Sequence, residues 1–246
     1  MNILHVSRKK GFTLVEILLA LFICLILLAT VYFAVTTGQR SSRGVEIKVA
    51  AQQDVRAILE TMALEVEMAS YNPTFQPSFW RNPGDCTTLA TNQANRGIQL
   101  ATPTSLSVQM DLDGNSRIFQ VGSTGDLNEI ITYDYDMDNQ RITRQVNCAG
   151  VTSFLGDLAG SVRSVRVVND VNQNSTYDEA VDIPVFRYFD VNGTEIPAAN
   201  LSTNISLIRR IEINLSVETE EIDPSTRARR RMNYTTSVVP RNHGYR

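Results

Sequence analysis

The chain has 246 residues, of which 43% are hydrophobic and 20% are charged, and its formal net charge is −3 at pH 7. This length allows one sizeable domain or two small ones, and the acidic balance argues against nucleic acid as the main partner. The two histidines, His5 and His243, belong to no Ser/His/Asp, Cys/His, zinc or phosphate-loop pattern, so we expect no catalytic residue, no enzyme activity and no required cofactor.

The first element is a short basic segment followed by a long apolar one. Residues 8–10 are cations, Gly11 follows them, and residues 12–35 contain no Gly or Pro. About 20 apolar residues suffice for a helix to cross a bilayer, so residues 12–35 are the predicted transmembrane helix. Glu16 needs a partner, because an unpaired carboxylate within such a helix costs about 2.5–3.5 kcal/mol. Cleavage after Gly11 would create an amine on Phe12, one helical turn from Glu16.

The letters Lys-Gly-Phe-Thr-Leu-Val-Glu at residues 10–16, followed by an apolar helix, resemble the class III signal sequence of type IV prepilins and pseudopilins. The resemblance implies that prepilin peptidase removes residues 1–11 as a leader, cutting after Gly11, and methylates the new amino terminus, Phe12. It also implies that Glu16 aligns subunits during assembly. The alternative is an uncleaved signal anchor in which Glu16 lies near the membrane interface.

The basic residues on the two sides of the apolar segment balance each other. Cytoplasmic loops usually hold the excess of Lys and Arg, but each side has three of them: Arg8, Lys9, Lys10 and Arg40, Arg43, Lys48. Charge therefore does not orient the helix. The resemblance does, and it implies a single-pass protein of the bacterial inner membrane with a periplasmic carboxyl-terminal domain, which then enters a pilus or pseudopilus. Loss of the leader's three cations leaves side chains with a net charge of −6.

Residues 36–70 are predicted to continue the helix as an amphipathic one, although two glycines between residues 36 and 44 weaken it. An apolar stripe recurs at spacings of three and four residues: Val55, Leu59, Met62, Val66 and Ala69. Residues 71–246 are the predicted extracytoplasmic β-rich domain. Its first part, residues 71–96, is rich in proline and aromatic residues, which indicates a loop packed onto the domain.

Alternating apolar and polar residues predict strands in the rest of the chain: 98–101, 106–111, 117–122, 129–135, 141–146, 154–158, 162–168, 184–190, 194–196, 207–219 and 228–239. A tight turn is expected at residues 113–115, between the second and third of these. One long helix followed by a mainly antiparallel sheet is an α+β fold. This arrangement is similar to larger minor pilins and pseudopilins of the PilW and GspJ kind.

The three cysteines fit this placement. Cys24 lies within the apolar helix and packs as a small apolar residue. Cys86 and Cys148 would both lie in an oxidising compartment, where a disulfide is allowed. The sequence leaves open whether their α-carbons approach closely enough, and we favour a disulfide over two free thiols.

Three segments carry alternating oxygen ligands of the kind that calcium loops use. In residues 111–115 the glycine comes too early, and residues 134–138 lack both the glycine and the late acid. The third segment is the predicted calcium site, although Ser175 stands where glycine belongs and Val181 where the closing acid belongs. Its ligands would be Asp170, Asn172, Asn174, Asp178 and Asp182. The alternative is a polar turn between two strands.

Arginines cluster late in the chain, at positions 227, 229, 230, 231, 241 and 246. We interpret them as solvated residues of a strand and of a polar tail that includes His243, in preference to a phosphate-binding patch.

The sequence predicts a minor pilin-like structural subunit that is incorporated at or near the tip of a type IV pilus and primes assembly. Its expected partners are prepilin peptidase, other minor and major pilins or pseudopilins, the inner-membrane assembly platform and membrane lipid, with no nucleic acid. One alternative is a minor, GspJ-like pseudopilin of a type II secretion system. Another is a membrane-tethered binding domain or adhesin outside any filament, although a tether gains nothing from Glu16.

Overall fold

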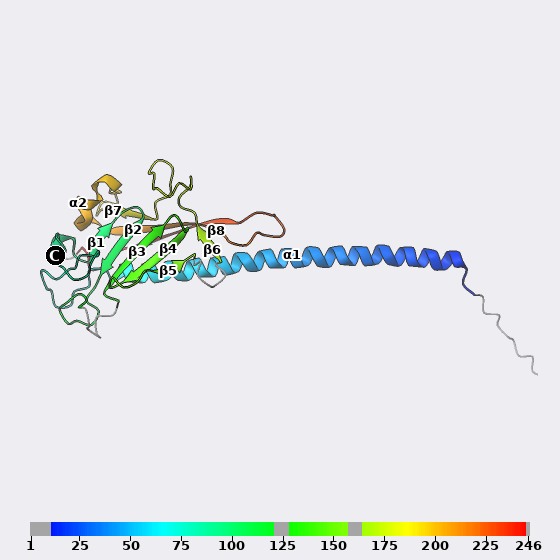
Figure 1. Cartoon of the computed structure of the whole chain (residues 1–246), viewed down its shortest axis with the longest axis horizontal. Coiled ribbons are helices and arrows are strands. Elements are labelled where there is room, and N and C mark those ends of the chain that lie inside the picture. The colour runs from blue at the N-terminus through cyan, green and yellow to red at the C-terminus, as the bar shows by residue number, and fades with distance from the viewer. Residues whose placement is uncertain (1–10, 121–127, 157–163, 245–246) are drawn as a thin grey trace, which may run out of the picture.

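A computed structural model describes residues 11–120, 128–156 and 164–244. A single long helix, α1 (Leu14–Glu67), projects from a domain built on its carboxyl-terminal half (Figure 1). Its 54 residues span about 80 Å at 1.5 Å per residue. The helix continues without a break through Gly38 and Gly44, so the two glycines weaken this stretch without interrupting it in the isolated chain.

The amphipathic half of α1 packs on the domain through one buried stripe, which confirms the predicted periodicity. Ala69 is also buried, just beyond the end of the helix. An ion pair adds to this contact, because Nη2 of Arg144 lies 2.6 Å from Oε1 of Glu65 on α1. The buried residues of α1 are Gly44, Ala51, Val55, Leu59, Met62 and Val66.

The first sheet is an antiparallel meander in which each strand pairs with the next. Its order follows the chain because short connections favour pairing between neighbouring strands. The strands are β1 (Ile98–Ala101), β2 (Ser105–Gln109), β3 (Ile130–Asp136), β4 (Arg141–Val146) and β5 (Thr152–Leu155).

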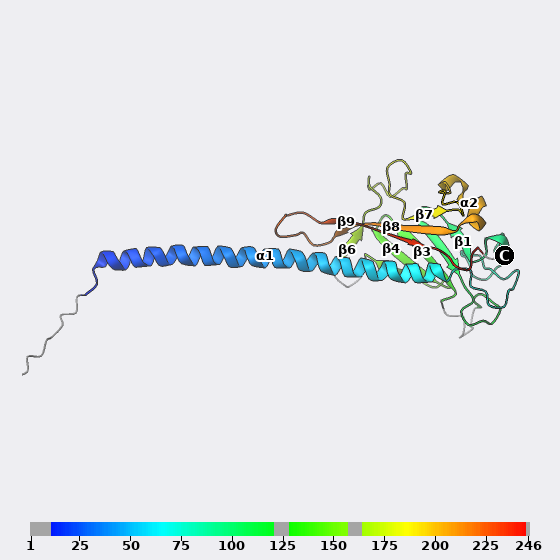
Figure 2. The same ribbon diagram turned by 180° about the vertical axis from the view of Figure 1, so that it is seen from behind.

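The second sheet is organised around its longest strand, β8, which pairs antiparallel with the other three. β9 runs beside α1 (Figure 2), and β5, β8 and β9 all contact the helix. One buried apolar core therefore joins α1 to both sheets, and the predicted α+β fold is confirmed. The strands are β6 (Val165–Val167), β7 (Phe186–Phe189), β8 (Arg210–Thr219) and β9 (Arg231–Val238). Short helical turns lie at η1 (Gln93–Asn95), η2 (Ala198–Asn200), α2 (Leu201–Asn204) and η3 (Ile205–Leu207).

Two predicted strands are wrong. Residues 117–120 form a loop, because the backbone N–H of Phe119 donates to the Glu129 carboxylate instead of to a neighbouring strand; residues 121 and 122 lie outside the described residues. The turn at 113–115 therefore does not join two strands. Residues 194–196 contribute only an isolated bridge between Glu195 and Phe189. Within the described residues, the strands predicted at 154–158 and 162–168 are found at Thr152–Leu155 and Val165–Val167; residues 157–163 lie outside them.

The carboxyl-terminal segment closes the far end of the domain. The prediction of a solvated polar tail that includes His243 is wrong. This side chain is buried, its Nδ1 lies 2.8 Å from Oγ of Ser70, and its Nε2 lies 3.0 Å from the carbonyl oxygen of Ile205. Burial lowers the pKa of His243 to about 4, so at neutral pH the ring is uncharged. We assign the proton to Nε2, which donates to Ile205, while Nδ1 accepts from Ser70.

Candidate functional site

Glu16 lies at the start of α1 and forms a capping box with Thr13. The backbone N–H of Thr13 donates to Oε2 of Glu16 over 2.8 Å, and the backbone N–H of Glu16 donates to Oγ1 of Thr13 over 3.3 Å. This reciprocal arrangement satisfies amide groups that a helix start otherwise leaves free. Within the described residues, Thr13 supplies all the hydrogen bonds to the Glu16 side chain. The carboxylate is otherwise exposed and available to a second molecule.

Gly11 and Phe12 precede the helix in an extended segment and are both exposed; the Phe12 side chain is 84% accessible. A Cβ atom added at Gly11 would meet no heavy atom within 4 Å. The packing of the described chain therefore does not require a glycine here. Recognition by another protein is a reason for one.

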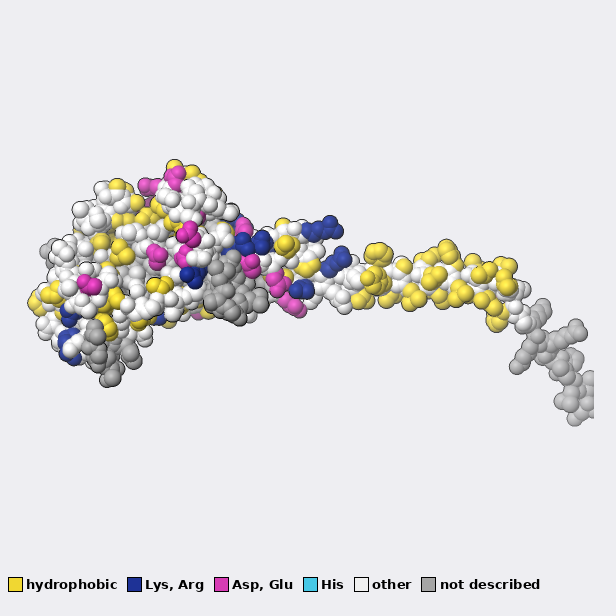
Figure 3. Space-filling model, viewed as in Figure 1, with side chains coloured by type: hydrophobic (Ala, Val, Ile, Leu, Met, Phe, Trp, Pro, Cys, Tyr) yellow, Lys and Arg dark blue, Asp and Glu magenta, His cyan; other side chains and the backbone are white. Residues whose placement is uncertain are grey.

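The apolar half of α1 is covered by no other part of the described chain. Every residue from Leu14 to Val35 is exposed, whereas the domain buries its helix stripe only from Gly44 onwards. Figure 3 shows this half as a projecting hydrophobic rod. By length and composition it is a helix able to cross a membrane. Because exposed apolar surface is unfavourable in water, this segment needs lipid or neighbouring helices.

The predicted calcium segment forms a compact loop whose carboxylates are bound by backbone amides. Oδ2 of Asp170 accepts from the N–H of Ser175 over 2.9 Å. The two oxygens of Asp182 accept from Val171 and Asp178 over 2.8 and 2.7 Å. Ser175 adopts a φ of +60°, the conformation that usually favours glycine. The structure thus gathers Asp170 and Asp182 around one loop, while Asn172, Asn174 and Asp178 accept hydrogen bonds from the amides of residues 174, 176 and 180.

A second loop repeats this geometry at a segment that sequence reasoning had set aside. Asp111 accepts from the N–H of Ser116 over 3.1 Å, and Glu129 accepts from Leu112 and Phe119, each over 3.0 Å. Carboxylate oxygens of Asp111, Asp113 and Glu129 lie within 4.8 Å of one another. Burial, followed by the charge of Asp113, raises the pKa of Asp111, against the effect of the amide donors. Glu129 was missed because it lies 18 positions after Asp111, beyond the twelve-residue loop that serves as the template.

Calcium binding at the Asp170 loop stays a prediction. If it occurs, a chelator should lower the melting temperature by a few degrees, because a ligand that binds only the folded state stabilises it by mass action. Differential scanning fluorimetry of the purified chain measures this. Asp182→Asn should abolish the shift, whereas Glu129→Gln, the matched change in the other loop, should preserve it. An unchanged melting temperature across a calcium titration would identify the segment as a polar turn.

Cys86 and Cys148 are joined by a disulfide, with their α-carbons 5.9 Å apart. The bridge lies in a small second core with Phe79, Trp80 and Ile118, separate from the main core. The aromatic loop at 71–96 is therefore attached to the domain by both packing and a covalent bond. Cys24 is free and exposed on the apolar helix.

The disulfide is expected to contribute about 4 kcal/mol to the free energy of unfolding in the loop-entropy treatment, because the two cysteines are 62 residues apart. Denaturant unfolding of a Cys86→Ser/Cys148→Ser variant against the unaltered chain measures this difference. Cys24→Ser is the matched control and should leave stability unchanged. Alkylation of the denatured, unreduced protein should label Cys24 alone; three labels would show that the bridge is not formed.

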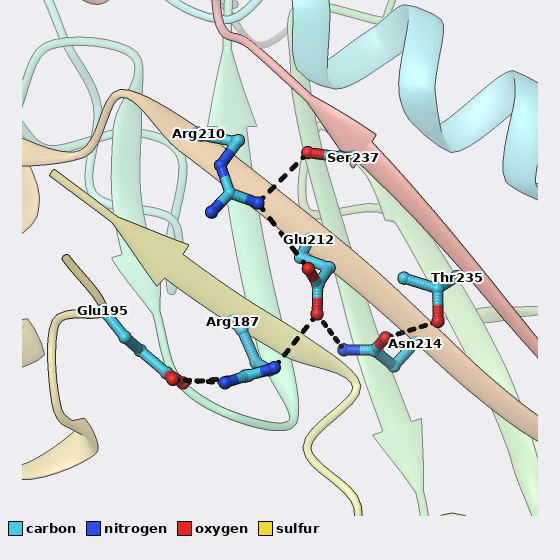
Figure 4. Close-up of polar contacts among 7 residues, drawn as sticks. All are labelled: Arg187, Glu195, Arg210, Glu212, Asn214, Thr235 and Ser237. Carbon is cyan, nitrogen blue, oxygen red and sulfur yellow. Dashed lines mark hydrogen bonds and ion pairs between the residues drawn. The ribbon is translucent and has the colours of Figure 1, made fainter. Parts of the chain in front are cut away.

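A polar network covers one face of β7, β8 and β9, with Glu212 at its centre (Figure 4). Oε1 of Glu212 lies 3.2 Å from Nη1 of Arg187, and Oε2 lies 3.6 Å from Nη1 of Arg210. Asn214 links this carboxylate to Thr235 on β9. Since each charged side chain in the network has an oppositely charged partner in the same network, we interpret the network as structural: it links neighbouring strands. Its members are Arg187, Glu195, Arg210, Glu212, Asn214, Thr235 and Ser237.

Comparison with known protein families supports the signal sequence predicted at the amino terminus. Residues 6–32 match the family model described as a prokaryotic N-terminal methylation motif. No curated protein and no solved structure matched the chain. The motif implies processing by prepilin peptidase and assembly with other pilins, and together with the apolar helix it fits a membrane-anchored pilin. Near its amino terminus, the chain therefore carries the class III signal sequence of the type IV pilins and pseudopilins.

Proposed function

We propose that the protein is a minor pilin-like structural subunit of the PilW kind, which enters a type IV pilus at or near the tip and primes its assembly. Its task would be assembly and not catalysis, and it would need no cofactor. The observation that carries the proposal is the uncovered apolar helix with Glu16 in its first turn. Such a helix finds partners only in lipid or in a bundle of similar helices.

The mechanism follows from the start of α1. Cleavage after Gly11 leaves an amine on Phe12, and a carboxylate with an ammonium group forms a strong, charge-assisted hydrogen bond. Glu16 of one subunit and Phe12 of its neighbour would meet only when the helices have the correct axial offset. The domain, attached from Gly44 onwards, would then face outwards from the helical bundle.

Two other assignments compete with this one. A minor, GspJ-like pseudopilin of a type II secretion system would use the same helix and the same signal. A tethered binding domain or adhesin is favoured by a different observation, an open cavity of about 600 Å³ lined mainly by residues 70–96. This segment lies at the end of the domain farthest from the apolar helix (Figure 1). The cavity is lined in part by Tyr71, Phe75, Trp80 and Arg96, and Phe75 is 87% exposed.

Immunogold labelling of sheared surface filaments tests the proposal directly. A minor pilin should give label at filament ends, together with loss of filaments when the gene is deleted. Normal piliation with loss of protein secretion would instead support the pseudopilin. Membrane-bound label without any in filaments would support the tethered domain.

A further inference from the structure

The loop between β8 and β9, residues 220–230, extends along α1 towards the apolar segment (Figures 1 and 2). Nη2 of Arg43 lies 3.2 Å from Oε2 of Glu221. A Cβ atom added at Gly44 would lie only 2.8 Å from Oδ1 of Asp223, which is closer than real Cβ atoms approach. The loop is therefore seated directly on α1, at the first point where the helix meets the domain.

Internal contacts give this loop a defined shape. The Asp223 carboxylate is buried, accepts from the N–H of Ser225 over 2.8 Å, and forms an ion pair with Arg230. The backbone N–H groups of Asp223 and Arg227 also donate to carbonyls within the loop. Because these contacts do not depend on the membrane or on other subunits, the loop presents its remaining side chains from a fixed position.

The surface around this contact is basic, although the chain as a whole is acidic. Residues 36–48 and 220–231 together hold seven basic residues and four acidic ones, Glu46 beside Arg43 among them, whereas the chain without its leader has a net charge of −6. Figure 3 shows dark blue side chains next to the apolar rod, at the edge of the domain, with magenta acidic side chains among them towards the domain. Four exposed arginines make up what we call the basic collar: Arg40, Arg43, Arg227 and Arg229.

The acidic residues nearby neutralise only part of the collar. Arg43 forms an ion pair with Glu221, and Nη2 of Arg229 lies 3.7 Å from Oε1 of Glu220. Among the described residues, Arg40 and Arg227 have no acidic oxygen within 4.0 Å. Exposed pairs such as that of Arg43 contribute little free energy, so these arginines can exchange partners at small cost. The collar thus retains an unbalanced positive charge.

The length of α1 places the collar at the membrane surface. Arg40 is 28 residues after Phe12, which corresponds to about 42 Å of helix. A bilayer with its head groups is about 40–45 Å thick. When the Phe12 amine lies in one head-group layer, Arg40 and Arg43 therefore lie in the opposite one. The β8–β9 loop is held at the same level by its contacts with residues 43 and 44.

We propose that the basic collar docks on the anionic phospholipid head groups of the membrane that α1 crosses. Basic residues close to an anionic leaflet are attracted to it within about one Debye length. Ile222, 54% exposed beside them in the loop, adds an apolar side chain suited to the interface. This inference rests on the membrane-anchored stage of the proposed function. It gives Arg227 and Arg229, two of the late arginines, a lipid-binding role, where the sequence had suggested only solvated side chains.

The full-length chain in phospholipid vesicles allows a direct test. A donor fluorophore is attached at Thr226→Cys, an exposed loop position, in a Cys24→Ser background, and energy transfer is compared between acceptor-labelled phosphatidylglycerol and acceptor-labelled phosphatidylcholine. We expect stronger transfer to phosphatidylglycerol, with a ratio that falls at high salt. Removing each charge by Arg40→Gln or Arg227→Gln should lower the ratio by up to roughly five-fold.

Two controls make the test specific. Arg117 is also exposed but lies elsewhere in the domain, so Arg117→Gln should leave the ratio unchanged. A label at Phe75→Cys on the far end should show no lipid preference. The proposed docking of the collar would be overturned by a phosphatidylglycerol-to-phosphatidylcholine transfer ratio of one in the wild-type protein. A ratio that is unchanged in the Arg40→Gln/Arg227→Gln variant would overturn it too. Release of the wild-type chain by alkali would overturn the membrane anchor as well, so the two failures are distinguishable.

Discussion

Replacing Glu16 with alanine is expected to remove the subunit from sheared filaments. In a bundle of apolar helices, the Phe12 ammonium of a neighbouring subunit would supply both the opposite charge and hydrogen-bond donors for this carboxylate. Loss of one partner of a buried charge pair costs about 2 kcal/mol or more, which corresponds to roughly thirty-fold in occupancy. Glu16→Gln should be almost as defective, because it keeps the shape and loses the charge. Immunoblotting of sheared filaments measures both variants.

The same variants should leave cleavage, membrane insertion and the fold of the domain unchanged, because among the described residues the Glu16 side chain hydrogen-bonds only to Thr13 at the start of its own helix. Thr13→Ala is the matched control: it removes the side-chain hydrogen bonds to Glu16 but keeps the carboxylate, and incorporation should persist. Wild-type incorporation of both Glu16 variants would make this residue an incidental interfacial one. The tethered domain would then become the better assignment.

Replacing Gly11 with valine is expected to leave essentially all of the protein as uncleaved precursor in the membrane. A Cβ atom at this position meets no heavy atom of the described chain within 4 Å, its two chain neighbours aside, so an effect on processing reports on recognition by the peptidase and not on folding. In the unaltered protein, mass spectrometry of the amino-terminal peptide should find N-methylated Phe12.

Gly38 offers a matched control for this experiment, since a Cβ atom added there also meets nothing within 4 Å. Gly38→Ala should be processed normally. An intact Met1 in the wild-type protein, or a cut at another position, would contradict the assignment of the signal sequence.

Local pattern was enough to predict much of the fold. The buried stripe on α1 follows the 3.6-residue period, and in β3 every second side chain from Ile131 to Tyr135 is buried, so the partners of these two elements did not need to be known. The strand predicted from residue 117 shows the limit of this reasoning. Ile118 and Phe119 lie in a strand-like pattern of residues. Ile118, however, is buried beside the disulfide, and the backbone N–H of Phe119 donates to the Glu129 carboxylate. Neither the disulfide nor Glu129 is adjacent to these residues in the sequence.

The same limit applies to the candidate sites. The signal sequence was readable because its residues are consecutive and each acts at its own position. The contact of Asp223 with Gly44, by contrast, joins positions that are far apart in the chain, and no spacing rule connects them. Glu129 likewise reaches Asp111 only after an intervening segment has returned the chain to the same sheet. Pairings of this kind depend on the tertiary fold.

The second sheet also imposes an order on the events of biogenesis. Among the described strands, β6 and β7 pair only with β8, which is synthesised after both of them. Ser70 contacts His243, which is synthesised 173 residues later. Contacts between distant parts of a chain form late and slowly. The first sheet can assemble while synthesis continues, but the domain is complete only when the last segment has arrived. In a membrane-anchored pilin, α1 would therefore be available for insertion well before the domain that surrounds its second half can close its core.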